Sequence, residues 1–139
     1  MNSNWFLWIS LTLAAILIAV STSGLRVFAR AIAFAEGYGV PGAIPTVRNN
    51  PGDLKLPSSG GAITTFASAV EGWAALYRQL DLIVTGRSNV YTIGMTIGEM
   101  ARRYTATEQT IWTGNVVKYL QKNGYPQVTA QTPLRDVLL

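Results

Sequence analysis

The feature that most constrains this chain is a single carboxylate at the end of an apolar helical run. From Leu25 the residues are apolar at helical spacing, and Glu36 closes the run before Gly37 and Gly39. No other charged residue stands within five positions of Glu36 on either side. Apolar neighbours and the negative end of a helix dipole both disfavour an ionised carboxylate. We therefore expect a central, buried helix and a raised pKa for Glu36, as a general acid working near neutral pH requires.

A long loop follows this helix. Residues 40–61 hold four of the six prolines of the chain, and a loop of this length is uncommon unless it is functional. It contains the polar run Arg48-Asn49-Asn50-Pro51-Gly52-Asp53-Leu54. Residues 54–65 leave room for a short β-hairpin. The pattern predicts a long ordered loop with a polar cluster inside it.

Helix start and stop signals divide the remainder of the chain into four helical segments. They run from Ser68 to Gly86, from Thr96 to near Tyr104, from Thr107 to Asn123-Gly124, and onward from Thr132-Pro133. The first two open with capping boxes, because a glutamate follows the capping hydroxyl at the third position. Trp73, Tyr77 and Trp112 lie at core-facing spacing, and we expect them to pack rather than to bind a ligand. The sequence therefore predicts a mainly α domain.

Composition excludes several kinds of chemistry. The chain has no cysteine and no histidine, so disulfides, thiolate chemistry and Ser-His or Cys-His catalysis are excluded. The commonest zinc ligand is also missing, and we expect no metal site. A net charge of +4 suits a negatively charged partner, whether an anionic cell-wall polymer, a membrane surface or nucleic acid.

The N-terminal segment is apolar enough to lie in a membrane. No charged side chain precedes Arg26, and residues 4–23 are just long enough to span a bilayer. Ala19 and Ser21 would fit a cleavable signal peptide, but no Lys or Arg precedes the apolar run, as such a peptide requires. We therefore favour one retained transmembrane anchor over residues 4–23, followed by a domain over residues 25–139.

The orientation that the charges predict for this anchor conflicts with a wall-degrading role at a bacterial inner membrane. Arg26 and Arg30 directly after the span would keep the domain on the cytoplasmic side by the positive-inside rule. That side does not suit a wall-degrading enzyme in a bacterial inner membrane. A virion membrane, or insertion helped by another protein, would remove the conflict.

Only two of the seven acidic residues lack a local structural explanation. The other five sit in capping boxes, in first helical turns or beside a basic residue: Glu71, Glu99, Glu108, Asp136, and Asp81 three residues from Arg78. For Asp53 we prefer an Asx turn after Gly52. For Glu36 the residues alone leave two interpretations open, a catalytic acid or an exposed acid that merely ends its helix.

Two parts of the sequence resemble a known family. Glu36-Gly37-Tyr38, followed by the run from Arg48 to Leu54, is similar to the acidic helix end and the RNNNPGNL-type loop of phage-associated peptidoglycan-cleaving proteins in the lysozyme-like superfamily. Weaker matches continue at Phe66–Leu80, Thr96-Ile97 and Tyr104, so that the likeness covers about residues 30–120. The loop here is one Asn shorter, and Asp53 stands where the family usually has a second Asn.

The resemblance implies a lysozyme-like fold and cleavage of the β-1,4 bond between MurNAc and GlcNAc in peptidoglycan. In a lytic transglycosylase of this kind, Glu36 would be the single general acid and base, and no cofactor would be needed. If Asp53 instead faces Glu36, hydrolysis by two carboxyl groups becomes the alternative. A phage or membrane context is implied, in a virion membrane or in a bacterial inner membrane facing the periplasm.

Five residues are candidates for substrate binding: Arg48, Asn49, Asn50, Asp53 and Tyr104. The amides of Asn49 and Asn50 suit sugar hydroxyl and N-acetyl groups, but they fit turn formation before Pro51 equally well. Arg48 suits a peptide-stem carboxylate or a solvated loop position. The resemblance implies that Tyr104 lies over the cleft near Glu36.

A different class of function competes with the enzyme. Residues 96–111 also fit a helix-turn-helix, with Ala101 at the crossing and a recognition helix starting at Thr107. The positive charge agrees with this interpretation. However, that helix carries no Arg or Lys before Lys118, and Glu36 and the Asn-Pro-Gly loop are left unexplained. We therefore prefer a peptidoglycan-cleaving enzyme to a DNA-binding protein or to a decayed, purely structural lysozyme-like domain.

Overall fold

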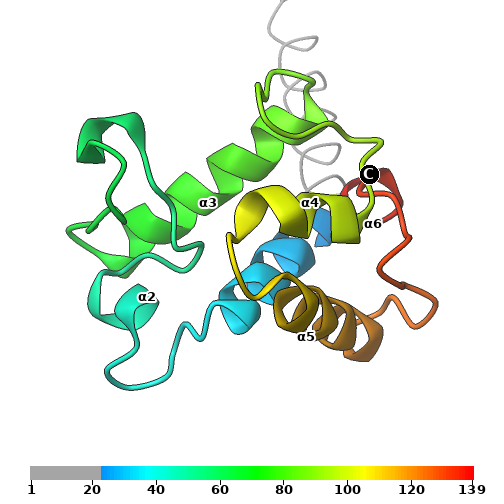
Figure 1. The fold of residues 1–139 in the computed structure, drawn as a ribbon, viewed down its shortest axis with the longest axis horizontal. Coiled ribbons are helices and arrows are strands. Elements are labelled where there is room, and N and C mark those ends of the chain that lie inside the picture. Colours follow the sequence, from blue (N-terminus) through cyan, green and yellow to red (C-terminus); the bar gives the residue numbers. More distant parts are fainter. Residues whose placement is uncertain (1–22) are drawn as a thin grey trace, which may run out of the picture.

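The computed structural model describes residues 23–139, and this part of the chain is mainly helical, as predicted (Figure 1). Its elements are a helix over residues 23–35, α2 (Ile44–Val47), the 3-10 turn η1 (Pro57–Ser59), α3 (Ala69–Val84), α4 (Ile97–Tyr104), α5 (Gln109–Lys122) and α6 (Arg135–Leu138). The anchor predicted over residues 4–23 falls outside the described residues, except for its last position. Within residues 23–139 no helix has the length and apolarity needed to cross a bilayer.

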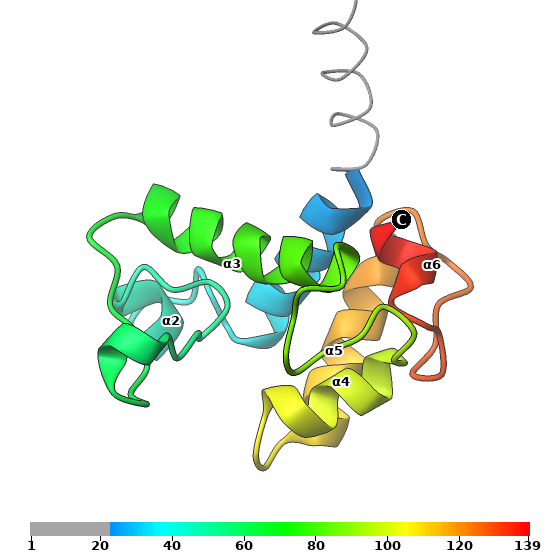
Figure 2. The same cartoon turned by 90° about the horizontal axis from the view of Figure 1, so that it is seen from above.

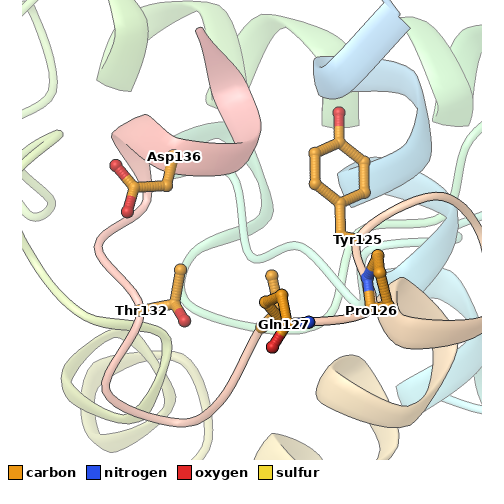
Figure 3. A pocket seen from close by; sticks show the side chains of 6 residues that line it. Tyr125, Pro126, Gln127, Thr132 and Asp136 are labelled. Atoms are coloured by element: carbon orange, nitrogen blue, oxygen red, sulfur yellow. The ribbon is translucent and has the colours of Figure 1, made fainter.

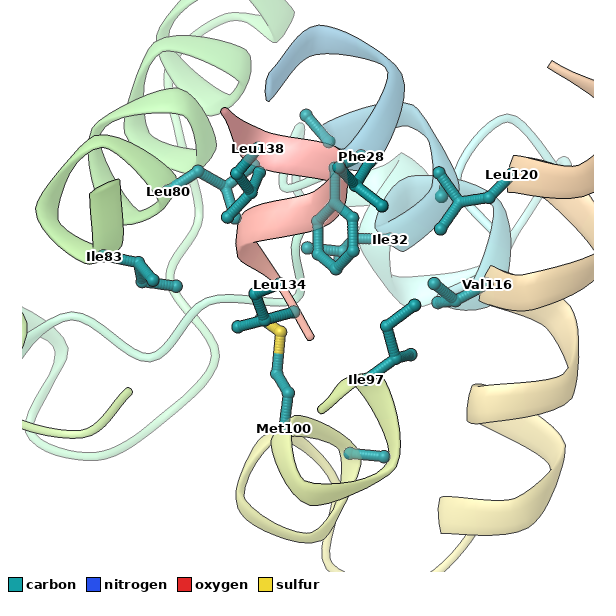
Figure 4. Close-up of a cluster of buried hydrophobic side chains, with 14 of the residues drawn as sticks. Phe28, Ile32, Leu80, Ile83, Ile97, Met100, Val116, Leu120, Leu134 and Leu138 are labelled. Atoms are coloured by element: carbon teal, nitrogen blue, oxygen red, sulfur yellow. The ribbon is translucent and has the colours of Figure 1, made fainter. Parts of the chain in front are cut away.

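The helix over residues 23–35, here called the central helix, is the centre of the core. Phe28, Ala29, Ala31 and Ile32 have no exposed surface. Phe28 and Ile32 lie among apolar side chains from α3, α4, α5 and α6 (Figure 4). Each such buried side chain is worth about 1.5–3 kcal/mol. The prediction of a central, buried helix is therefore confirmed, and its C-terminal end is held rigidly.

The elements divide on either side of this helix. Viewed from above, α3 crosses over the central helix, with α2 and η1 on one side and α4, α5 and α6 on the other (Figure 2). The last residues of the central helix lie between these two groups in both views (Figures 1 and 2). The chain after Glu36 therefore starts near the middle of the domain.

The predicted capping boxes form, one of them only in part. The Thr96 hydroxyl accepts from Glu99 N at 3.1 Å, and Glu99 Oε2 accepts from Thr96 N at 2.8 Å. At α3, Ser68 Oγ accepts from Glu71 N at 3.2 Å, but the Glu71 carboxylate accepts from Ala67 N instead of Ser68 N. Both starts lie where the sequence predicted them.

Two predicted helix starts are wrong. Glu108, not Thr107, is the N-cap of α5, because its carbonyl accepts the first helical bond from the backbone N of buried Trp112 at 2.8 Å. The N-cap of α6 is Leu134. Thr132 and Pro133 precede it and contact the start of α4 instead. Ile97 N donates a hydrogen bond to Thr132 O, and Thr96 and Pro133 form an isolated antiparallel β-bridge.

The expected β-hairpin over residues 54–65 is a loop without regular strands. One backbone hydrogen bond joins its arms, from Thr64 N to Leu54 O at 2.9 Å. At the tip, Pro57 lacks an amide hydrogen and opens η1, and Ser59 Oγ donates to the carbonyls of Leu56 and Ala62. The ladder therefore cannot continue to the turn.

The expected pair between Asp81 and Arg78 does not form. Asp81 Oδ2 lies 3.2 Å from Arg87 Nη2 instead, and both side chains are largely exposed. The turn at Gly86, which has a φ of 70°, brings Arg87 back over the end of α3. A pair this exposed contributes about 0–1 kcal/mol and does not position the candidate site.

Two helical glycines give a matched test of how the loop packs on α3. A Cβ at Gly72 would stand 1.8 Å from the backbone O of Asn49, whereas a Cβ at Gly114 in α5 would meet no atom within 4 Å. We expect Gly72→Ala to lower the free energy of unfolding by about 2 kcal/mol or more, and Gly114→Ala to raise it by about 0.5–1 kcal/mol. Urea denaturation of the full chain in a mild non-ionic detergent measures both. A neutral Gly72→Ala would contradict the close approach of the loop to α3.

Candidate active site

Glu36 stands one residue beyond the end of the central helix. Its backbone N still donates to Ile32 O at 2.9 Å, and Tyr38 N closes the helix end on Ala33 O at 2.9 Å. Gly37 takes a φ of 78°, which lets the chain turn away immediately after the acid. The Glu36 side chain is half-buried, so it is partly shielded by the domain and still reached by solvent.

The Glu36 carboxyl is held by a residue far away in the sequence. Trp112 Nε1 donates to Glu36 Oε1 at 2.7 Å across 76 positions. Trp112 is 4% exposed and stacks on Tyr104, with ring centroids 5.0 Å apart. The Tyr104 hydroxyl donates in turn to Gly52 O at 2.5 Å. One chain of contacts therefore joins the end of the central helix, α5, α4 and the turn that precedes Asp53.

Burial changes the acidity of Glu36. Its pKa is raised from 4.5 to about 7, mainly by desolvation. The hydrogen bond from Trp112 acts in the opposite direction, and the charges of Asp53 and Glu108 add to the rise. The direction agrees with the prediction from the sequence. The structure adds two causes that local sequence did not reveal, since Asp53 and Glu108 come from other segments.

Asp53 belongs to the same site. It has a φ of 49°, and its Oδ1 is buried without a hydrogen-bond partner among the described residues. Desolvation raises its pKa, and the charges of Lys55 and Arg48 oppose that rise. The Asx turn that we preferred does not form. Instead, the Asp53 carboxyl contributes to the electrostatic environment of Glu36.

Asn50 is a structural residue of the loop. It is fully buried, its Nδ2 donates to Leu54 O and Thr64 O at 2.9 Å each, and its Oδ1 accepts from Leu54 N at 2.9 Å. Both amide hydrogens are used, so no donor is left for a sugar. Of the two roles that the sequence allowed, the structure places Asn50 in turn formation.

Asn49 and Arg48 also hold the loop. Asn49 has a φ of 50°, and its Nδ2 donates to Phe66 O at 3.2 Å. Arg48 Nη1 donates to Ile63 O at 2.7 Å. Both side chains are half-buried. Neither side chain takes part in the chain of contacts from Glu36 through Trp112 and Tyr104 to Gly52.

The aromatic residues separate into two groups. Tyr104 lies at the Glu36 site, as the resemblance implied, but its hydroxyl is engaged by Gly52. Trp73 packs edge-on against Tyr38 at 5.5 Å and beside Tyr77 at 5.9 Å. Trp112 packs in the core as predicted, but its hydrogen bond to Glu36 was missed. No local pattern reveals that contact, because it joins two helices that are distant in sequence.

Two hollows lie away from Glu36. One of about 240 Å³ is lined by Tyr125, Pro126, Gln127, Val128, Thr132 and Asp136 (Figure 3). The other, of about 480 Å³, lies between α4, α5 and residues 129–131, and Arg102 is the charged residue in its lining. Neither brings two acids together. Over residues 23–139 no cluster of three acidic, His or Cys side chains could hold a metal ion. Among the acidic side chains of residues 23–139, those of Glu36 and Asp53 have raised pKa values.

No protein-family model matches the chain, and neither a curated protein nor a solved structure is significantly similar to it. The function of the chain is therefore inferred from the chemistry of the site.

The raised pKa of Glu36 predicts a pH-dependent stability. The unfolded chain releases this proton near pH 4.5 and the folded chain near pH 7, so folding stability falls as pH rises between these values. We expect Glu36→Gln, which keeps an oxygen acceptor for Trp112, to be more stable than the wild type by about 2–3 kcal/mol at pH 8 and equal to it at pH 4.

Thermal and urea unfolding of the full chain at both pH values measure this difference. Asp136→Asn, at an exposed acid that does not act on Glu36, is the matched control and should change the free energy of unfolding by less than about 0.5 kcal/mol at both pH values. An equal effect of Glu36→Gln at pH 4 and pH 8 would show that Glu36 titrates normally.

The structural role of Asn50 gives a separate prediction. Asn50→Ala removes three hydrogen bonds of a buried amide and leaves backbone groups unpaired, so it should lower the free energy of unfolding by about 2–4 kcal/mol. Asn89→Ala, at an exposed loop position, should change it by less than about 0.5 kcal/mol. Urea denaturation compares the two variants, and equal stabilities would contradict the assignment.

Proposed function

We propose that this protein cleaves the β-1,4 bond between MurNAc and GlcNAc in bacterial peptidoglycan, as a lytic transglycosylase or muramidase. The proposed fold of residues 25–139 is lysozyme-like. The observation that carries the proposal is the half-buried Glu36 carboxyl at a rigid helix end, whose pKa is raised to about 7. An acid with this pKa is about half protonated at neutral pH, so one side chain can first donate a proton and then accept one.

The transglycosylase route needs only this acid. Protonated Glu36 gives its proton to the glycosidic oxygen, the bond from that oxygen to C1 of MurNAc breaks, and GlcNAc leaves with a hydroxyl group. The N-acetyl oxygen of MurNAc bonds to C1, and the positive charge is delocalised over the resulting oxazolinium ring. The Glu36 carboxylate then takes the proton from the C6 hydroxyl, whose oxygen displaces the N-acetyl group and closes a 1,6-anhydro ring. Glu36 is protonated again, and no water or cofactor is consumed.

Hydrolysis is a second candidate because of Asp53. Its charge raises the pKa of Glu36, and its buried Oδ1 accepts no hydrogen bond within the described residues. A buried oxygen without a donor is costly, and such atoms are often explained by a bound water or a catalytic role. A carboxyl in this position is suited to activate water at C1, as in two-carboxylate glycosidases.

The resemblance at Glu36-Gly37-Tyr38 and at the Asn-Pro-Gly loop supports a wall substrate. We propose that a single-pass anchor over residues 4–23 holds the domain at a virion membrane or at a bacterial inner membrane facing the periplasm. Arg26 and Arg30 are both exposed directly after this segment and suit anionic lipid.

DNA binding is the alternative. The exposed residues in the first turn of α5 are Thr110 and Ile111, and neither supplies a cation for phosphate. Salt-dependent DNA binding by the full chain, without release of wall fragments, would favour that alternative over an enzyme.

Substitution of the two acids separates the possible reactions. Glu36→Gln should reduce release of muropeptides from purified peptidoglycan by about 10²–10⁴-fold, because both proton transfers are lost. Asp53→Asn with retained activity and anhydro ends would support a transglycosylase, whereas complete loss would support a two-carboxylate hydrolase. Mass spectrometry of the products distinguishes the transglycosylase from the hydrolase, since an anhydro end is lighter than a reducing end by one water. Asp136→Asn, at an exposed acid that does not act on Glu36, is the control, and full activity of Glu36→Gln would refute the proposal.

A further inference from the structure

We propose that Trp112 is a positioning residue that keeps Oε1 of Glu36 as a hydrogen-bond acceptor, so that Oε2 is the oxygen that gives and takes the proton. The contact that carries this inference is the 2.7 Å hydrogen bond from Trp112 Nε1 to Glu36 Oε1. The catalytic consequence rests on the proposed function. The hydrogen bond and its effect on Glu36 can be tested without a substrate.

The chemistry of indole sets which oxygen carries the proton. An indole N–H can donate but cannot accept a hydrogen bond. If the proton of neutral Glu36 were on Oε1 and directed toward Trp112, two hydrogens would point at each other. The proton of the neutral acid therefore belongs on Oε2. After the proton has left, Oε1 still accepts from Trp112, and Oε2 is free to act as the base.

The donor is fixed before the reaction. Trp112 is 4% exposed, and the next turns of α5 are anchored by fully buried Val116 and Leu120. Its ring stacks on Tyr104, whose hydroxyl is engaged by Gly52 O. A donor held in this way needs little reorganisation when Glu36 changes its charge.

The other groups that face Glu36 disfavour its charged form, so the Trp112 indole N–H matters for the availability of the carboxylate. Asp53 from the loop and Glu108 from the start of α5 disfavour the carboxylate, as does burial. Tyr104 from α4 is neutral at physiological pH, because burial holds its pKa well above 10. Of these contributions to the acidity of Glu36, the hydrogen bond from Trp112 is the one that favours the charged form. Without it, Glu36 would remain an acid but become a less available base.

Trp112→Phe tests the assignment in the full chain, because phenylalanine keeps an aromatic ring for stacking and removes the donor. Titration of the Glu36 side-chain carbonyl by ¹³C NMR should show a pKa higher by about one unit. The alkaline limb of the pH profile for peptidoglycan cleavage should move upward with it, since the first step needs the protonated acid. We expect kcat to fall by about 10–100-fold with little change in KM.

Trp73→Phe is the matched control. Trp73 is half-buried and also contacts aromatic rings, but its indole N–H donates to no described residue. This variant should leave the Glu36 titration and the pH profile unchanged. A folded Trp112→Phe protein with the same Glu36 pKa and pH profile as the wild type would overturn the proposal.

A second measurement covers the case in which Trp112→Phe does not fold. In the wild type, the ¹⁵N–¹H signal of the Trp112 indole should titrate with a midpoint near that of Glu36, and Glu36→Gln should abolish this titration. The signal of Trp73 should not respond. A Trp112 indole signal whose chemical shift does not change as Glu36 titrates would overturn the proposal. Coupled titration in a protein that releases no wall fragments would support the hydrogen-bond assignment and refute the proposed function.

Discussion

The candidate site depends on burial of one carboxyl group at the end of a helix that the whole core surrounds. The C-terminal end of the central helix, which precedes Glu36, lies between the segment that contains α2 and the segment that contains α4 and α5 (Figure 2). Desolvation there favours the neutral acid, and a hydrogen bond from Trp112 keeps the charged form accessible. These opposing effects keep the pKa of Glu36 near 7, where one group can serve as both acid and base.

The long loop acts as a support for this arrangement. Asn50 uses its whole amide to join Leu54 and Thr64, and Gly72 lets the backbone at Asn49 pack directly on α3. In the turn at residues 51–53, the Gly52 carbonyl accepts a hydrogen bond from the Tyr104 hydroxyl, and the charge of Asp53 acts on Glu36. The polar run that resembles a substrate-binding motif therefore mainly stabilises the loop itself. Its residue Asp53 also raises the pKa of Glu36.

Local patterns predicted the helices well where the deciding contacts are local. The Thr96–Glu99 box lies at the start of α4, and Gly86 follows the end of α3, because these signals involve residues one turn apart. The predicted start of α5 was one residue too early, since Glu108 O accepts the first helical bond. The predicted role of Thr132-Pro133 was wrong because Thr132 O accepts a hydrogen bond from Ile97 N, in a distant segment. The hairpin failed because the hydroxyl of Ser59 and the proline at position 57 compete with strand pairing.

The sequence by itself determined that Glu36 ends an apolar helix without a neighbouring charge, and from this its raised pKa follows. It also determined that no histidine or cysteine could share the chemistry. Only the tertiary structure decided which groups meet that acid. Trp112 reaches Glu36 across 76 positions, and Asp53 and Glu108 come from other segments. The physical reason is that desolvation of a helix end follows from nearby residues, whereas a hydrogen bond or a charge contact requires distant segments to pack together.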